Sequence, residues 1–406
     1  MDAVSTRFLP YGRHSVDDDD VAAVAEVLRS DWLTGGPVVE RFEAAFAERV
    51  GARFAVACSS ATAGLHMATL ALGIGPGRAV LVPALTFLAT ANAARFVNAE
   101  VAFADVDPES GLMGPEHLAP ALAEAKRQGL TVCAVAPVHY AGQAVDVAAL
   151  RRALDEAGLA DVAIVEDASH AIGTDLRGGG RVGDCADSAM AVFSLHPVKT
   201  IAMGEGGLVT TNDAALAVRL RRARNHGMVR EPENYTDKAL GFDADGTPNP
   251  WYYEMQEIGC NYRASAIHCA LGLSQLGKLD QFVARRRALA ARYDRLLAPL
   301  APLVEPLGRQ EACDPAWHLY VARIDFATIG KSRAAAMRAL AARGVGSQVH
   351  YLPLHLQPYY RRRYGEQSLP GAEALYGQML SLPLFPAMAE SDVDRVVDAL
   401  REVVGG

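Results

Sequence analysis

Short apolar runs alternate with amphipathic segments through the first half of the chain. The runs have the length of buried strands rather than of helices, and they lie at residues 54–58, 79–83, 101–105, 132–137, 162–166, 190–195 and 208–211. The segments between them, such as 115–128 and 146–157, repeat apolar residues at helical spacing. This alternation predicts an α/β fold in which helices cover both faces of a mostly parallel sheet.

Helices are also predicted on either side of this region. An acidic run at 17–20 precedes an amphipathic segment that ends near Arg29. We expect Ser15 to cap this helix, and because the aspartates suit the positive end of the helix dipole, they need no metal. Further helices are predicted at 38–50, 214–224, 264–276 and 279–297.

The pattern changes toward the C-terminus. Residues 318–325 and 345–351 resemble strands, and 331–343 and 390–404 are amphipathic helices. We therefore predict two domains. The first is a large α/β domain at residues 1–280, and the second is a smaller α+β domain at residues 281–406.

Lys199 is the most informative residue, because it lies between two runs that read as buried strands. A lysine is costly there unless it is paired or reactive. If burial lowers its pKa, its amine becomes a nucleophile able to form a Schiff base. Glycines at 204, 206 and 207 allow the backbone to approach a flat ligand closely. The alternative is a plain hairpin with a surface lysine.

Asp167 favours the reactive lysine, because it ends the apolar run at 162–166. Ligands of parallel sheets collect at the carboxyl ends of the strands. A carboxylate at one strand end and a lysine at the next are what pyridoxal phosphate chemistry requires. The lysine forms the imine, and the carboxylate keeps the pyridine nitrogen protonated.

Small residues at 59–62 lie between a predicted strand and a predicted helix. Free backbone N–H groups and hydroxyls at a helix N-terminus form a natural phosphate seat, although a simple helix cap is an alternative. Phe87, at the start of a later helix, either stacks on an aromatic cofactor or belongs to the core.

Two loops carry features that point to function. Residues 30–37 are rich in glycine and proline yet contain Trp32, which indicates a binding loop. Residues 225–257 form a long polar excursion that we expect to be a surface loop, and long loops of compact domains tend to be functional.

The amino-acid composition limits the kinds of partner and site that we expect. The net charge of −8 over 406 residues argues against nucleic acid as the main partner. The six cysteines include no CxxC pair, so free thiols in a reducing cytoplasm are expected, with no metal site. No apolar leader begins the chain and no run is long enough for a membrane span, so we expect a soluble cytoplasmic protein.

The ordered motifs resemble a known family. Phe193-Ser-Leu-His-Pro-Val-Lys199 with Gly204-Glu-Gly-Gly207, Glu166-Asp-Ala-Ser-His170 upstream and Gly259-Cys-Asn-Tyr-Arg263 downstream are similar to the pyridoxal-phosphate sugar aminotransferases of the DegT/DnrJ/EryC/StrS group. The likeness extends from Tyr11 to the C-terminus. It implies a fold-type I aminotransferase, and a homodimer whose active sites lie at the subunit interface.

The resemblance implies roles for individual residues. Lys199, Asp167 and His170 are the expected catalytic residues: the lysine binds the cofactor and shuttles protons, the aspartate pairs with the pyridinium nitrogen, and the histidine lies near the ring hydroxyl. Phe87 covers the ring. Ala61, Thr62 and Ser194 hold the phosphate, and Asn261 reaches it from the neighbouring subunit. Ala61 departs from the group, which mostly has glycine there, and Leu195 stands where relatives often have an aromatic residue.

The resemblance also implies a substrate site. The residues expected to contact the sugar nucleotide are Tyr11, Asp31, Trp32, Leu33, Thr34, Gln348, Val349, His350 and Tyr351, together with Ala61, Ser194 and Asn261.

A narrower likeness is to the branch of the group that acts in pseudaminic acid synthesis. It rests on His196-Pro-Val-Lys199, Arg224-Asn-His-Gly-Met-Val229, Asn249-Pro-Trp-Tyr-Tyr-Glu-Met-Gln256 and Gln348-Val-His-Tyr351. It implies transfer of the amino group of L-glutamate to C4 of UDP-4-keto-6-deoxy-N-acetyl-β-L-altrosamine. The alternatives are an aminotransferase for another TDP- or UDP-linked ketosugar, at C3 or C4, and a non-catalytic binding or regulatory protein of the same fold.

Overall fold

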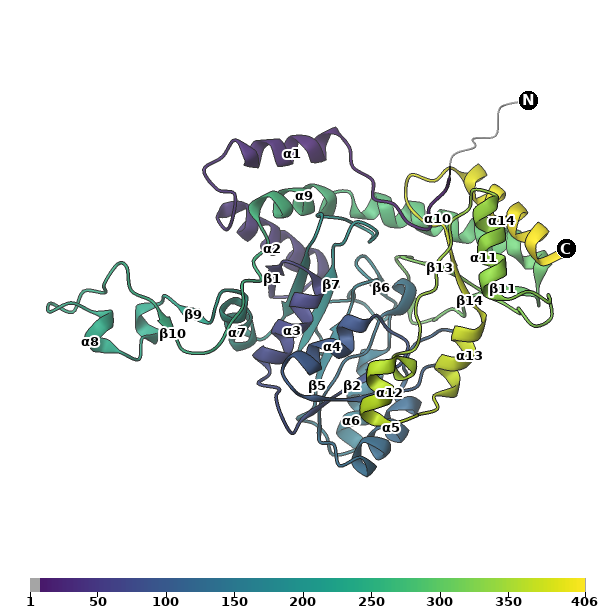
Figure 1. The fold of residues 1–406 in the computed structure, drawn as a ribbon. Helices are drawn as coiled ribbons and strands as arrows, with labels where there is room; N and C mark the ends of the chain where they lie inside the picture. The colour runs from purple at the N-terminus through teal and green to yellow at the C-terminus, as the bar shows by residue number, and fades with distance from the viewer. Residues whose placement is uncertain (1–7, 406) are drawn as a thin grey trace.

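A seven-stranded sheet forms the centre of the molecule. The computed structural model describes residues 8–405 (Figure 1). The strand order is β1-β8-β7-β5-β4-β2-β3. The strands are β1 (Phe54–Cys58), β2 (Ala79–Pro83), β3 (Glu100–Ala104), β4 (Val132–Val135), β5 (Ala163–Asp167), β7 (Met190–Ser194) and β8 (Gly207–Thr211). All neighbours pair in parallel except β8, which is antiparallel to both β1 and β7. The predicted mostly parallel sheet is therefore confirmed.

Helices cover both faces of this sheet, because successive side chains of each strand point to opposite sides. On one face, Leu81 and Phe193 belong to cores that include α2 (Pro37–Val50), α5 (Pro115–Arg127), α6 (Val147–Glu156) and α10 (Leu279–Leu297). On the other face, Val82 and Val192 pack with α3 (Ala61–Ala71), α4 (Leu88–Phe96) and α7 (Ala214–Arg224). Within residues 8–405, no helix is both long enough and apolar enough to cross a lipid bilayer.

The first helix, α1 (Asp18–Leu28), begins differently from the expectation. Asp17, not Ser15, is its N-cap: the Asp17 carboxylate accepts hydrogen bonds from the N–H groups of Asp19 and Asp20, each at 3.1 Å. In return the Asp17 N–H donates to the Asp20 carboxylate at 3.1 Å. The N-cap is thus an aspartate that lies two residues after the predicted serine. The helix α1 packs on α9 (Ala266–Leu276).

The C-terminal part builds a three-stranded antiparallel sheet of β11 (Val304–Pro306), β13 (Tyr320–Ile324) and β14 (Met379–Leu382). Its helices are α11 (Arg333–Ala342), α12 (Pro358–Tyr364), α13 (Pro370–Gln378) and α14 (Glu390–Gly405). A single apolar core joins this part to the central sheet, since it contains both Leu81 and Leu380. The boundary at residue 280 therefore stays a prediction.

The prediction of a strand at residues 345–351 was wrong. This segment makes two isolated bridges, Val345 with Leu9 and Gln348 with Ser381, and the sheet is completed by β11 and β14, which the sequence pattern did not predict. The carbonyl of His350 accepts instead from the buried Tyr140 hydroxyl. A four-residue strand ending just before Pro383 is too short to give a periodic signal.

Residues 228–255 form an arm that projects from the body beyond α7 (Figure 1). Its base is the antiparallel pair β9 (Met228–Val229) and β10 (Glu254–Met255), and α8 (Lys238–Gly241) lies near its tip. Glu254 accepts hydrogen bonds from the N–H groups of Thr236 (2.9 Å) and Asp237 (2.8 Å). The expected surface loop is therefore a folded unit, although it lies away from the central core.

Glu43 connects three elements behind the site. From α2 it accepts the N–H of Ala57 in β1 at 2.8 Å, and it forms an ion pair with Arg224 of α7. Arg224 Nη1 also donates to the Ala57 carbonyl at 2.8 Å. Because β1 leads directly into α3, this cluster fixes the position of the α3 N-terminus.

We expect Glu43→Ala to lower the free energy of unfolding by about 3 kcal/mol, because it leaves the Arg224 guanidinium largely buried without its partner. Urea denaturation measures this. Asp280→Ala is the matched control: Asp280 pairs with Arg49 but its side chain is exposed, so we expect a loss below about 1 kcal/mol. Equal losses in the two variants would contradict this account.

Candidate active site

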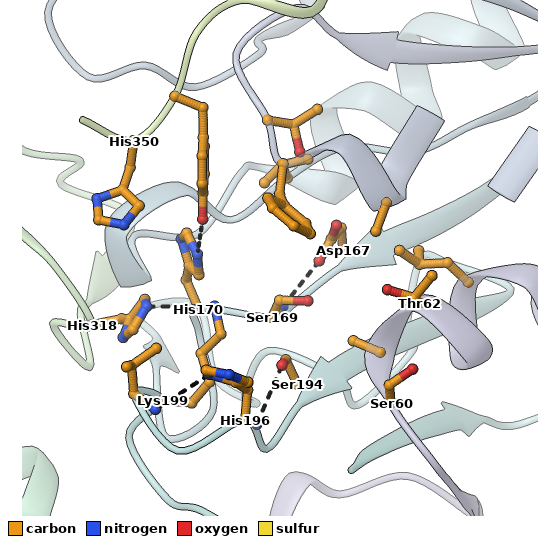
Figure 2. Close-up of a pocket in the computed structure, with 18 of the residues that line it drawn as sticks. Ser60, Thr62, Asp167, Ser169, His170, Ser194, His196, Lys199, His318 and His350 are labelled. Carbon is orange, nitrogen blue, oxygen red and sulfur yellow. Dashed lines mark hydrogen bonds between the residues drawn. The ribbon is translucent and has the colours of Figure 1, made fainter. Parts of the chain in front are cut away.

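A cavity of about 350 Å³ opens at the carboxyl ends of β5 and β7. Figure 2 shows Ser60, Thr62 and Ser194 on one side of it and Lys199, His170, His318 and His350 on the other. The walls come from the central sheet, from the start of α3 and from the C-terminal part of the chain. Segments far apart in the sequence therefore meet at one place, at the edge of the sheet where parallel α/β folds bind ligands.

Asp167 is the last residue of β5 and only 4% exposed. Its carboxylate accepts hydrogen bonds from the Thr90 hydroxyl at 2.7 Å and from the Ser169 N–H at 3.1 Å. Among residues 8–405 it forms no ion pair within 4 Å. A buried carboxylate held by neutral donors is suited to a cation that enters the cavity from outside the chain.

The backbone of Asp167 is fixed from behind by His139. The Nε2 of His139 lies 2.7 Å from the carboxylate of the adjacent Glu166, and its Nδ1 accepts the Val145 N–H at 2.9 Å. Nδ1 is thus the acceptor, so Nε2 carries the proton and donates to Glu166. The His139 N–H donates to the Asp167 carbonyl at 3.1 Å. Consecutive residues of β5 are therefore both anchored to the same histidine.

Lys199 lies on the connection between β7 and β8, where its N–H donates to the His196 carbonyl at 2.8 Å. Its half-buried side chain lines the cavity, with Nζ 3.4 Å from His318 Nε2. Burial lowers the pKa of Lys199 to about 8, Arg286 adds to this shift, and Asp167 opposes it. The strands β7 and β8 do pair as in a hairpin, but the amine between them faces the cavity rather than solvent.

His170 is buried beside the lysine. Burial lowers the pKa of His170 well below its usual value, and Lys199 and His350 act in the same direction. Its Nδ1 accepts the Ala141 N–H at 3.3 Å, and its Nε2 lies 3.0 Å from the Tyr351 hydroxyl. The imidazole is therefore neutral, with its proton on Nε2 and directed at Tyr351.

The N-terminus of α3 closes the other end of the cavity. The Ser60 hydroxyl caps the helix by accepting the Ala63 N–H at 3.1 Å. The N–H groups of Ala61 and Thr62 donate to no other group within residues 8–405. Gly207 permits this arrangement, because a Cβ there would lie 2.6 Å from the Ala61 nitrogen. The cap and the predicted phosphate seat are thus compatible, since the cap leaves two N–H donors free for an anion.

The cavity collects most of the residues that the sequence singled out. Those lining it are Tyr11, Ala61, Thr62, Phe87, Asp167, His170, Ser194, Lys199, His350 and Tyr351. Phe87 is not part of the core: it is 53% exposed, and its ring centroid lies 5.7 Å from that of Tyr351.

Other predicted contacts lie outside this cavity. They are Asp31, Trp32, Leu33, Thr34, Asn261, Gln348 and Val349. The first four form an exposed loop beside α9, where the Leu33 carbonyl accepts the Ala266 N–H at 3.0 Å. Asn261 is also exposed. The roles of these residues stay predictions.

Thr90, His139 and His318 were not predicted from the sequence as parts of the site. His139 could have been noticed, because it follows the apolar run at 132–137 as Asp167 follows its own run. Thr90 lies inside a helix and His318 precedes a strand of the C-terminal part, so neither carries a local signal. Only the folded chain brings them to Asp167 and Lys199.

The residues present fit pyridoxal phosphate. The buried Asp167 carboxylate suits a cationic ring nitrogen, the free N–H groups of α3 suit a phosphate, and the exposed face of Phe87 suits an aromatic ring. Lys199 Nζ supplies the amine. These four functions are arranged around one cavity of sufficient volume for a molecule of that size.

We expect the reactivity of Lys199, in protein freed of pyridoxal phosphate, to rise with pH through a midpoint near 8. At pH 7 about a tenth of these amines are then neutral, against fewer than about one in a thousand for an ordinary lysine in water. Acylation followed by peptide mass spectrometry measures this midpoint. A value near 10 would contradict the effect ascribed to burial.

Comparisons with known proteins agree with this geometry. Residues 14–401 match the profile of the DegT/DnrJ/EryC1/StrS aminotransferase family. Among solved structures, the aminotransferase TlmJ from Streptoalloteichus hindustanus is 30% identical, with a TM-score of 0.84 over 98% of this chain and 99% of that one. DesV from S. venezuelae, solved with a ketimine intermediate, is 32% identical, with a TM-score of 0.81 and coverage of 98% and 99%.

Helicobacter pylori PseC, an aminotransferase involved in the biosynthesis of pseudoaminic acid, is 26% identical, with a TM-score of 0.85 over 98% of this chain and all of that one. These neighbours confirm the predicted fold-type I architecture. The chain belongs to the DegT/DnrJ/EryC1/StrS aminotransferase family, whose aminotransferases depend on pyridoxal phosphate.

Proposed function

We propose that this protein transfers the amino group of L-glutamate to C4 of UDP-4-keto-6-deoxy-N-acetyl-β-L-altrosamine, a step of pseudaminic acid synthesis. The observation that carries the proposal is the placement of Lys199 and Asp167 on one cavity that also contains a free helix N-terminus. The sugar assignment is supported by the full-length similarity to PseC and by the His196-Pro-Val-Lys199 and Gln348-Val-His-Tyr351 motifs.

The side chains of this cavity have complementary tasks. Bound pyridoxal phosphate supplies an electron-accepting ring and a carbonyl carbon. Asp167, held by Thr90 and Ser169, would supply the carboxylate that pairs with the protonated ring nitrogen. Lys199, with its pKa lowered to about 8, is available near neutral pH as the base that takes a proton and returns it. Neutral His170 orients Tyr351 at the cavity wall.

Hydroxyl donors on the C-terminal side suit a sugar. Burial raises the pKa of Tyr11 and also that of Tyr351, so both phenols remain protonated and can donate hydrogen bonds. The Tyr11 ring lies 5.3 Å from the ring of His350, whose Nδ1 lies 2.8 Å from the Ser381 hydroxyl. The two phenols, His350 and Ser381 line the cavity or support its wall, and none of them adds a negative charge. This suits an anionic sugar nucleotide, which a negative charge at this wall would repel.

The alternative substrate is another nucleotide-linked ketosugar, TDP- or UDP-linked, aminated at C3 or C4. This alternative is supported by the identities to DesV (32%) and TlmJ (30%), which are higher than the 26% identity to PseC. A non-catalytic role is disfavoured, because Lys199 is present and faces the cavity. We also propose a cytoplasmic location, which suits six cysteines that form no disulfide.

We expect Lys199→Ala to reduce 2-oxoglutarate formation at least about a thousandfold, because the nucleophile and base are both removed. Lys126→Ala, on the exposed face of α5, is the matched control and keeps full activity. The wild-type product from UDP-4-keto-6-deoxy-N-acetyl-β-L-altrosamine and glutamate is identified by mass spectrometry. Turnover of a different ketosugar alone would replace the proposed substrate, and transamination by Lys199→Ala would refute the mechanism.

We further propose that the protein is a homodimer in which each subunit completes the other's site. Asn261, expected at the phosphate, is exposed and outside the cavity of its own chain. Large apolar side chains are exposed on and near the arm, among them Trp251 (73%) and Ile258 (83%). Apolar surface of this kind marks a protein contact.

Mixing two inactive variants tests shared sites. In a hybrid dimer of Lys199→Ala and Asn261→Leu subunits, one site carries both substitutions and the other carries neither. After random exchange we expect about a quarter of wild-type activity to return, since half of the dimers are hybrids with one intact site each. Sites formed within single subunits would show no recovery.

A further inference from the structure

We infer that His318 is a positioning residue that holds the Nζ amine of Lys199 whenever this amine is not bonded to the cofactor. The inference rests on the proposed aminotransferase function. It begins from one contact: His318 Nε2 lies 3.4 Å from Lys199 Nζ, and within residues 8–405 no other side-chain atom lies within hydrogen-bonding distance of that amine. Figure 2 shows both side chains on the same wall of the cavity.

A released lysine needs such a partner. Its four-carbon stem has several rotatable bonds, so a free amine would sample many positions. Amino transfer requires the amine to stay beside the reacting carbon, since a proton moves efficiently only within hydrogen-bond reach. A hydrogen bond to His318 restricts the amine to one side of the cavity.

The second ring nitrogen of His318 is what suits it to this task. His318 is 4% exposed, and its Nδ1 is buried without a hydrogen-bond partner. In His170 the Nδ1 is bound by a backbone N–H, and in His350 it faces the Ser381 hydroxyl. His318 is thus the histidine of this wall whose proton can occupy either nitrogen without breaking another hydrogen bond.

This freedom matches the two states of the lysine. When Lys199 is an ammonium, Nε2 of His318 accepts its hydrogen bond and the ring proton lies on Nδ1. When Lys199 is a neutral amine, Nε2 carries the proton and donates it to the amine lone pair. The imidazole stays neutral in both states, because burial and Arg286 disfavour its protonation, and Lys199 adds to this effect when it is charged.

The backbone of His318 is rigidly held, as a positioning residue requires. Its N–H donates to the Ala141 carbonyl at 3.0 Å, and its own carbonyl accepts from Arg286 Nη1 at 3.2 Å. Arg286 is fully buried and also donates to the carbonyls of Trp317 and Leu384. The imidazole is therefore placed by the joint between the central sheet and the C-terminal part of the chain.

The test compares His318→Phe with His318→Gln in the holoenzyme. Phenylalanine keeps a ring but no hydrogen bond, whereas glutamine keeps a donor and an acceptor. In single turnovers with glutamate, we expect His318→Phe to slow amino transfer to the cofactor about tenfold, which corresponds to the loss of one hydrogen bond. The rate ratio between ordinary and α-deuterated glutamate should increase, because proton transfer becomes limiting. The saturation constant for glutamate should change less than about twofold, and His318→Gln should recover most of the rate.

Several outcomes would overturn the inference. One is a wild-type rate and isotope effect in His318→Phe. Another is an equal loss in both variants together with a lowered melting temperature, which indicates a structural role. Absence of amino transfer in the wild type itself would instead refute the proposed function, so the two failures are distinguishable.

A second measurement avoids substitution of His318. In wild-type protein labelled with ¹⁵N-histidine, we expect the His318 ring resonances to differ between the pyridoxal and pyridoxamine forms, since only the latter frees Lys199. Lys199→Met serves to assign the signal, because it removes the hydrogen-bond partner. Identical His318 resonances in the two wild-type forms would overturn the inference.

Discussion

The site depends on a carboxylate that the fold buries without a cationic side chain beside it. An unpaired ionised carboxylate in an apolar interior is strongly destabilising, so its surroundings must compensate. Asp167 is compensated only in part, by the Thr90 hydroxyl and the Ser169 N–H. The remaining stabilisation is available to a cationic ligand that enters the cavity.

The same cavity keeps Lys199 partly out of water. The free-energy costs of burying the Asp167 carboxylate and the Lys199 amine are coupled, because each charge affects the other. Asp167 favours the charged form of the lysine, whereas burial and Arg286 disfavour it more strongly. The amine is consequently poised near neutral pH, where it can both accept and release a proton. If Asp167 faced Lys199 directly as an ion pair, the lysine would remain charged. Their separation across the cavity leaves space for a ring between them, and this separation is what makes the arrangement reactive.

Local sequence patterns were sufficient to predict the central sheet and the functional residues at its edge. Asp167, Lys199 and the start of α3 follow apolar runs whose length alone identified buried strands, and the carboxyl ends of parallel strands necessarily meet. The C-terminal part was harder. The segment 345–351 has the composition of a strand but is held by isolated contacts to Leu9, Ser381 and Tyr140, while β14 is four residues long. Those pairings join residues distant in sequence, so no local pattern reports them. Thr90 and His318 were missed for the same reason.

This division has a functional meaning. The central sheet supplies the groups that suit the cofactor: the helix N-terminus, the carboxylate and the lysine. The C-terminal part supplies His318, His350 and Tyr351, which face those groups across the cavity. The two parts share one apolar core, so the position of one constrains the other. The groups that suit the cofactor lie at strand ends that short motifs identify, whereas the residues facing them come from the C-terminal part. For this reason the cofactor chemistry is recognisable from a few motifs, whereas a residue such as His318 is found only in the folded chain.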